Sequence, residues 1–194
     1  MVGTAPAPDS DAYPLGTRIA VFGKGGKTTL ARALADRFDL AFVELDALRH
    51  MAGWEERPDD DMRSMTAAIL DGSQQGWVLD GNYQILRELV FERVETVIVI
   101  ALPWKVMLWR TFKRSFLRAL KREELWNGNR ESFRLTFFSK SSVVYDLWFR
   151  RHHFRNMAEE FTEQIPGSID TYIIRSPKEL TNLYERHGLL RRRP

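Results

Sequence analysis

The chain has 194 residues, 44% hydrophobic and 28% charged, which suits one globular domain with a sizeable core and excludes a disordered chain. It has no cysteine, so disulfides and thiolate metal sites are excluded. No apolar run could span a membrane, and residues 1–16 have Asp and Pro where a signal peptide needs an apolar stretch, so we expect a cytoplasmic protein. The net charge of +3 conceals a split: residues 1–100 carry 10 Lys and Arg against 16 Asp and Glu, and residues 101–194 carry 19 against 10.

The first half of the chain predicts two strands around one helix. Residues 1–16 hold three of the eight prolines and predict a flexible leader. The apolar run 19–22 predicts a buried strand that stops at Gly23, and apolar residues recur at helical spacing from Thr28 onward. Residues 40–46 predict a second strand that ends in the carboxylate of Asp46.

The remaining pattern continues the alternation of helix and strand. Acidic residues after Pro58 indicate a helix start, and that helix has an apolar side of four residues: Met62, Met65, Ile69 and Leu70. Strands are predicted at 77–80, 94–102 and 169–174, and a last helix at 177–184. Such alternation predicts an α/β fold whose sheet is parallel, in a single domain of residues 17–190 followed by a basic tail, 191–194.

A glycine-rich loop between the first strand and the first helix is the strongest chemical signal. Its residues are Gly23, Lys24, Gly25, Gly26, Lys27, Thr28 and Thr29. Glycines let backbone N–H groups converge on phosphate oxygens, the lysine reaches the β- and γ-phosphates, and a threonine hydroxyl binds Mg²⁺. The standard pattern has four residues between the first glycine and the Gly-Lys pair, whereas Lys24 and Gly25 are the only two here. The loop therefore predicts ATP and Mg²⁺ binding with a contracted phosphate cradle.

Two carboxylates are predicted at strand ends, where ligands bind in open α/β sheets. Asp46 follows the second strand and Asp80 closes the third. Gly81 and Tyr83 come directly after Asp80 and are candidates to contact a phosphate acceptor, as is Trp54. Glu44 is a weaker candidate for a catalytic base.

A basic, aromatic block occupies residues 104–155, with 13 basic residues, 4 acidic residues and 12 aromatics. Pro103 suits the start of a helix to about Glu124, with an aromatic stripe opposite a basic arc. Three interpretations stay open: a solvated face over a packed stripe, a lid whose arginines serve phosphates, or a surface for nucleic acid or membrane. Aromatic residues in 132–155 predict packing onto the body or a homodimer contact.

Five stretches together resemble one family of proteins: RIAVFGKGGKTTLARALA, FVELD, WVLDGNY, LKREELWNGNRE and IRSP. They resemble the P-loop nucleoside and nucleotide kinases, nearest to the adenylate-kinase-like branch labelled topology modulation protein. The resemblance implies a three-layer P-loop NTPase fold with a five-stranded parallel sheet and a helical lid, about residues 104–155, between strands 4 and 5. The loop also resembles that of partitioning and nitrogenase-iron-protein ATPases, in which Lys24 would be the signature lysine.

The kinase resemblance also implies residue roles. Asp80 would support Mg²⁺ through water, Asp46 would address the acceptor, and the backbone at Arg175 and Pro177 would lie beside the adenine. Lid arginines would neutralise charge on the transferring phosphate; the candidates are Arg114, Arg118, Arg122 and Arg130.

The sequence thus predicts an ATP- and Mg²⁺-dependent phosphotransferase acting on a small-molecule or nucleotide acceptor. The alternative is a nucleotide-binding ATPase or regulatory module with weak or no kinase activity, which contacts nucleic acid or membrane through the basic, aromatic block. Nucleic acid is the less favoured partner, because the resemblance implies that arginines between the fourth and fifth strands clamp phosphates, and guanidinium groups suit phosphate oxygens.

Overall fold

The computed structural model describes residues 14–121, 124–129 and 161–191. Most of the predicted leader, the lid candidates Arg122 and Arg130, the aromatic region 132–155 and most of the basic tail lie outside the described residues.

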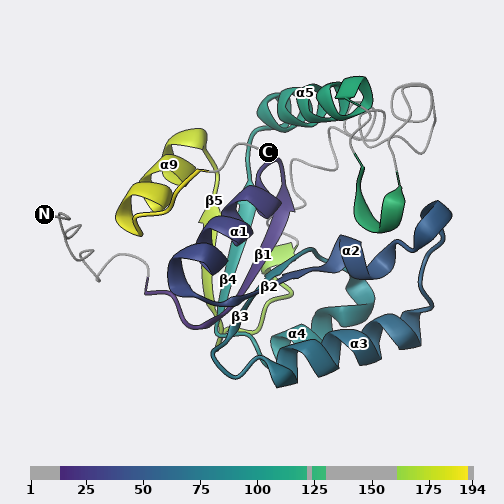
Figure 1. Ribbon diagram of the computed structural model, residues 1–194. Coiled ribbons are helices and arrows are strands. Elements are labelled where there is room, and N and C mark those ends of the chain that lie inside the picture. The colour runs from purple at the N-terminus through teal and green to yellow at the C-terminus, as the bar shows by residue number, and fades with distance from the viewer. Residues whose placement is uncertain (1–13, 122–123, 130–160, 192–194) are drawn as a thin grey trace, which may run out of the picture.

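Five parallel strands form one sheet in the order β2-β3-β1-β4-β5 (Figure 1). The strands are β1 Arg18–Lys24, β2 Ala41–Glu44, β3 Trp77–Asp80, β4 Thr96–Ala101 and β5 Asp170–Ile174. All five lie where the sequence predicts them, although β2 is shorter than expected. The predicted α/β class with a five-stranded parallel sheet is confirmed. Strand β1 is central: β3 and β2 lie on one side of it, and β4 and β5 lie on the other. The strand order therefore reverses at β1, and ligands are expected beyond its carboxyl end.

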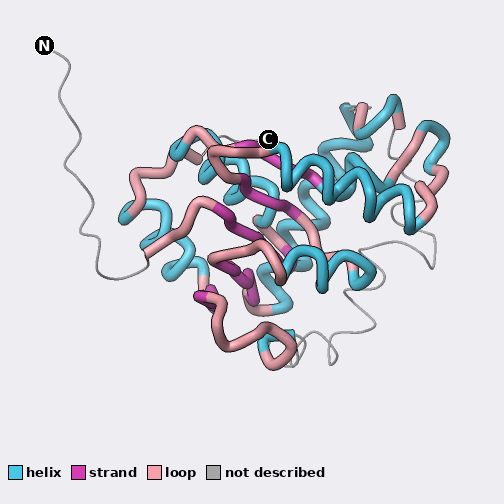
Figure 2. The backbone as a smooth tube through the Cα atoms, turned by 90° about the horizontal axis from the view of Figure 1, so that it is seen from below, coloured by secondary structure: helices cyan, strands magenta, loops and turns pink. Residues whose placement is uncertain are grey.

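Helices cover both faces of the sheet, as Figures 1 and 2 show. The helical elements are α1 Lys27–Phe38, α2 Leu45–Arg49, η1 Ala52–Trp54, α3 Asp59–Gly72, η2 Gln84–Leu86, α4 Arg87–Phe91, α5 Trp104–Lys121, η3 Trp126–Gly128 and α9 Pro177–Arg186. Helices α1 and α9 share one apolar core with Ile19 and Val21 of β1, whereas α3 and α4 share the other with Ala20 and Phe22. Alternate residues of β1 thus face opposite layers, so the strand reads as a continuous apolar run.

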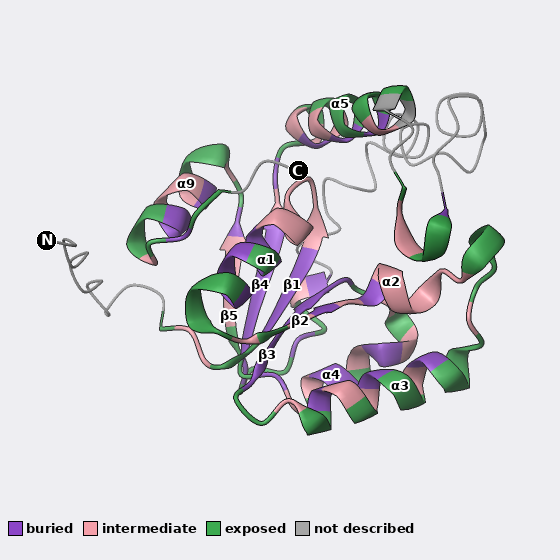
Figure 3. Ribbon diagram, in the orientation of Figure 1, coloured by how far each residue is buried: buried purple, intermediate pink, exposed green. Residues whose placement is uncertain are grey.

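Burial follows this three-layer arrangement, with buried strands and helices exposed on their outer sides (Figure 3). One predicted apolar position, Met65, is wrong. Met65 is 37% exposed, and the neighbouring Thr66 is buried in its place, where its hydroxyl donates to the Met62 carbonyl. Phe38 is 39% exposed at the end of α1. One residue rotates a helix face by 100°, so apolar spacing alone misplaces residues at the margin of a stripe.

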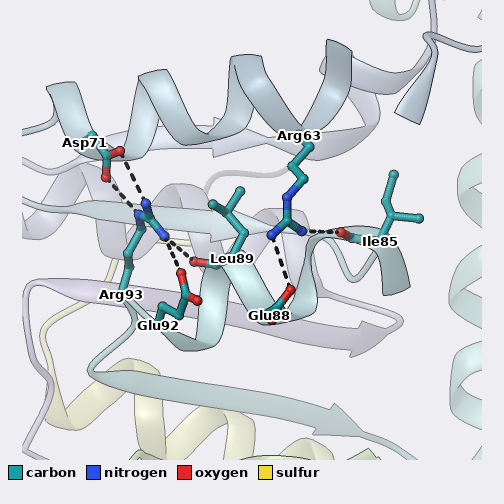
Figure 4. A network of polar contacts seen from close by, with 7 residues as sticks. All are labelled: Arg63, Asp71, Ile85, Glu88, Leu89, Glu92 and Arg93. Carbon is teal, nitrogen blue, oxygen red and sulfur yellow. Dashed lines mark hydrogen bonds and ion pairs between the residues drawn. The ribbon is translucent and has the colours of Figure 1, made fainter. Parts of the chain in front are cut away.

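Arginines connect α3 to the segment that contains η2 and α4, through acids and through the Ile85 carbonyl of η2 (Figure 4). The Arg93 Nε atom donates to Asp71 at 2.8 Å, and its Nη1 atom donates to the Leu89 carbonyl at 3.0 Å. Arg63 donates to the Ile85 carbonyl at 3.1 Å. Exposed ion pairs contribute little to stability, so the carbonyl contacts matter most for fixing the chain that follows β3.

The aromatic stripe of α5 faces outward. Trp109 and Leu120 are 64% and 62% exposed, and Phe112 stacks between Trp109 and Phe116 with ring centroids 6.4 and 6.1 Å apart. The buried side of the helix instead carries Met107, Thr111 and Ser115. A stripe packed on the body is therefore the wrong interpretation for this helix. Among the described residues, no helix is long and apolar enough to cross a membrane.

The last helix, α9, begins with a capping box. The Ser176 Oγ atom accepts the Glu179 N–H at 3.1 Å, and the Glu179 carboxylate accepts the Arg175 N–H and the Ser176 hydroxyl, each at 2.8 Å. Pro177 occupies the first turn, where its missing N–H costs nothing. The Arg175 N–H, followed by the Ser176 hydroxyl, lowers the pKa of Glu179 below its ordinary value.

We expect Ser176→Ala to lower the free energy of unfolding by about 1 kcal/mol at pH 7, measured by urea denaturation. Since the pKa of Glu179 is lowered in the folded state, its contribution is present above the ordinary carboxylate pKa and is lost as the pH falls through the folded value. The cost of the substitution should therefore shrink in acid. Ser168→Ala, at an exposed position, is the control; an equal loss in both variants would contradict the capping role.

Candidate functional site

The glycine-rich loop is very short. Strand β1 runs to Lys24 and helix α1 begins at Lys27, so only Gly25 and Gly26 lie between the two elements. The strand bends at Gly23, whose φ of 103° is in the left-handed region. A Cβ atom at Gly23 would overlap the Ile100 carbonyl of β4, so only glycine fits this turn.

The first turn of α1 is left open to an anion. Gly26 precedes the helix and makes no side-chain cap, and the first turn holds no acidic residue. Lys27, Thr28 and Thr29 are the first three residues of the helix. Their backbone N–H groups and the helix dipole create partial positive charge at the carboxyl end of β1.

Lys27 forms an ion pair with Asp80. The Lys27 Nζ atom lies 2.9 Å from Asp80 Oδ1, and the side chains are 19% and 1% exposed. Parallel pairing of β1 with β3, in which Val21 is opposite Asp80, brings the end of β3 under the loop. The predicted phosphate lysine and the predicted magnesium aspartate are therefore in direct contact.

Arg110 of α5 also reaches the loop, and the sequence did not single it out. Its Nη1 atom donates to the Gly25 carbonyl at 2.8 Å, and Met107 lies against Gly25 one turn earlier. Burial, followed by the nearby charge of Arg191, lowers the pKa of Arg110. The predicted basic arc included Arg110 among several similar arginines, so only the packing of α5 on the loop could distinguish it.

Asp46 and Tyr83 meet on the side of β3 away from β4. The Tyr83 hydroxyl donates to Asp46 Oδ1 at 2.8 Å. Asp46 is not the end of a strand, as the sequence predicted, but the second residue of α2. The φ of Gly81 is 133°, and a Cβ atom there would crowd Leu45 at 2.9 Å, so this glycine lets the segment after β3 approach α2. Burial, and next the Asp46 carboxylate, raises the pKa of Tyr83, which therefore stays a neutral donor.

Trp54 lies at the tip of a small hairpin, residues 49–57. The ladder consists of a bond from Arg57 N–H to the Arg49 carbonyl and one from Met51 N–H to the Glu55 carbonyl, both 2.8 Å. Trp54 is 39% exposed, and its ring packs edge-on against His50 and Trp126 at centroid distances of 5.6 and 6.5 Å. Trp126 belongs to η3, so the hairpin contacts the segment that follows α5.

The other predicted residues are placed as follows. Glu44 pairs with Arg32 at 2.9 Å. Arg114 is exposed and Arg118 is half-buried on α5. Arg175 is exposed, and its N–H donates to the Glu179 carboxylate of the capping box. Pro177 is the first residue of α9.

A divalent cation fits this site only together with phosphates. Within the described part of the chain, no group of three or more His, Cys, Asp or Glu side chains could hold a metal ion by itself. Mg²⁺ on nucleotides is usually held by one or two protein oxygens, with phosphates and water completing the shell. The buried carboxylate of Asp80 and the hydroxyl of Thr28 at the start of α1 are oxygen donors of this kind.

No protein-family model matches the chain, and no curated protein matches it in sequence. Structural neighbours include a gluconokinase from Sinorhizobium meliloti, at 17% identity and a TM-score of 0.49, with 88% of each chain covered. A sugar kinase from Janibacter sp. has 18% identity and a TM-score of 0.45, covering 90% of this chain and 96% of that one. An uncharacterized protein from Eubacterium ventriosum has 10% identity and a TM-score of 0.44, covering 89% and 99%. Likeness at this level does not extend to substrate or activity.

The class of fold follows from the sheet and the loop themselves. A parallel sheet between two helical layers, with a glycine-rich turn joining the central strand β1 to α1, is a P-loop type of α/β fold.

We expect Lys27→Met to lower the free energy of unfolding by about 3 kcal/mol, because it leaves the buried carboxylate of Asp80 without its cation. Adding Asp80→Asn should recover part of the loss, since an amide carries no charge to desolvate. Urea denaturation of the two single variants and the double variant measures the coupling. Additive losses in this cycle would contradict a stabilising pair.

Proposed function

We propose that this protein is an ATP- and Mg²⁺-dependent phosphotransferase that acts on a small acceptor. The nucleotide phosphates bind at the glycine-rich loop, and the acceptor binds beside Asp46 and Tyr83. The family branch suggested by the sequence motifs is part of the same proposal.

One observation carries the proposal: a four-residue segment joins the two halves of the site. Asp80, at its start, pairs with Lys27 of the phosphate loop, and Tyr83, at its end, bonds to Asp46. Three residues span at most about 11 Å between Cα atoms. The donor and acceptor sites are therefore close enough for direct transfer of a phosphoryl group, which depends on positioning and on neutralising charge.

Each residue would act through ordinary electrostatics. Lys27 and the first N–H groups of α1 would hold the β- and γ-phosphates, and Arg110 would add positive charge beside a loop that has fewer amides than usual. Asp46 Oδ2 would accept a hydrogen bond from the acceptor hydroxyl and then its proton, while Oδ1 accepts the Tyr83 hydroxyl. Thr28 and Asp80 would hold Mg²⁺, which neutralises charge on the phosphates when it is bound.

We expect Lys27→Arg to reduce turnover by at least about a hundredfold. The substitution keeps a cation beside Asp80, so the fold is retained, but a planar guanidinium does not replace a compact ammonium at the phosphates. The measurement is a nucleotide-consumption assay of the full chain with Mg²⁺, screened over nucleosides, nucleoside monophosphates, sugars and other small metabolites.

Two further variants make the assay selective. Lys178→Arg, on the exposed side of α9, should leave turnover unchanged. Lys24→Ala distinguishes the two families that the loop resembles. The substitution would abolish turnover if Lys24 were the signature lysine of the partitioning ATPases, and it would not if Lys27 is the phosphate lysine. If the wild-type protein binds nucleotide but consumes none with any acceptor, the phosphotransferase hypothesis is wrong and the hypothesis of a regulatory module is favoured.

A further inference from the structure

Two asparagine side chains in the turn after α5, residues 126–129, form hydrogen bonds to the hairpin 49–57. Asn127 donates to the His50 carbonyl, and Asn129 bonds to two backbone groups, one on each side of the hairpin tip. The His50 and Trp126 rings stack with centroids 5.6 Å apart, at 26° between their planes. These contacts join segments separated by more than 70 residues in sequence.

Asn129 closes the tip of the hairpin in place of a main-chain bond. Its Nδ2 atom donates to the Met51 carbonyl at 2.8 Å, and its Oδ1 atom accepts the Trp54 N–H at 3.0 Å. In a four-residue turn these two groups would bond to each other. Gly53, at the third position, has φ 75° and ψ 16°, as such a turn requires. The side-chain amide of Asn129 is thus inserted between the two ends of the turn.

The inserted amide stabilises an unusual backbone. Trp54 has a φ of 62°, which is a rare conformation for a bulky residue and costs free energy unless neighbouring contacts impose it. Asn129 is 5% exposed, so its two bonds are shielded from water. One partner is a donor and the other an acceptor, so only one orientation of the amide satisfies both, and neither alanine nor aspartate can replace it fully.

We propose that Asn129 is a positioning residue for the acceptor site, holding the hairpin 49–57 so that Trp54 and the preceding helix α2, which carries Asp46, keep a fixed geometry. Tyr83 reinforces this arrangement, because its hydroxyl donates a hydrogen bond to Asp46 of α2. The contact also joins the turn after α5 to the side of the sheet that carries Asp46. The role in acceptor binding rests on the proposed function, whereas the grip on the hairpin does not.

Exchange of the Trp54 backbone amide tests the grip without any assay of activity. Labelling with ¹⁵N-tryptophan marks the six tryptophans of the chain, and Trp54→Phe assigns the signal of interest. In Asn129→Ala the amide should exchange at least about tenfold faster than in the wild type, because its acceptor is gone. Asn129→Asp keeps an acceptor for Trp54 but opposes the Met51 carbonyl, so its exchange should be intermediate. Asn182→Ala, on α9, is the matched control and should match the wild type.

Kinetics of the same variants test the positioning role. Asn129→Ala should raise KM for the acceptor by about tenfold, with KM for the nucleotide changed less than about twofold. Unchanged exchange at Trp54 would overturn the proposal, and so would faster exchange with unaltered acceptor kinetics. If the wild type transfers phosphate to no acceptor, the proposed function fails, and the exchange measurement still decides whether Asn129 holds the hairpin.

Discussion

A buried carboxylate needs a cation, and the site is organised around the one that Lys27 supplies to Asp80. The pair fixes the start of α1 over the end of β3, and Gly81 then lets the chain approach α2 closely enough for Tyr83 to reach Asp46. Phosphates would compete with Asp80 for Lys27, and a divalent cation would replace the charge that Asp80 loses. Under the proposed function, the same interaction would stabilise the ligand-free fold and hold Lys27 in place for the nucleotide phosphates.

The acidic and basic halves of the sequence supply different parts of the candidate site. The acidic half supplies the sheet edge with Asp46 and Asp80, and the basic half places α5 against the phosphate loop, where Arg110 bonds to Gly25. The turn at 126–129 then returns to the acidic half and holds the hairpin 49–57. The exposed aromatic stripe of α5 does not contribute to either contact.

The strands, their parallel arrangement and the glycine-rich turn between β1 and α1 could be predicted because each depends on local pattern: apolar runs, glycines and helical spacing. Asp46 was placed on a strand that in fact ends at Glu44, since an edge strand has only one neighbour to prolong it. Arg110 and Asn129 could not be found in this way, because their partners lie 85 and about 75 residues away. Met65 and the α5 stripe show the same limit for burial, since spacing defines a helix face but not what covers it.

The proposed function requires that a loop with only two residues between β1 and α1 still binds nucleotide phosphates. Calorimetric titration of the full chain with ATP, ADP and AMP in the presence of Mg²⁺ tests it most directly. Binding through the loop amides and Lys27 requires affinity to rise with the β- and γ-phosphates, so ATP should bind at least about tenfold more tightly than AMP. No binding of ATP, or equal affinity for ATP and AMP, would contradict the account.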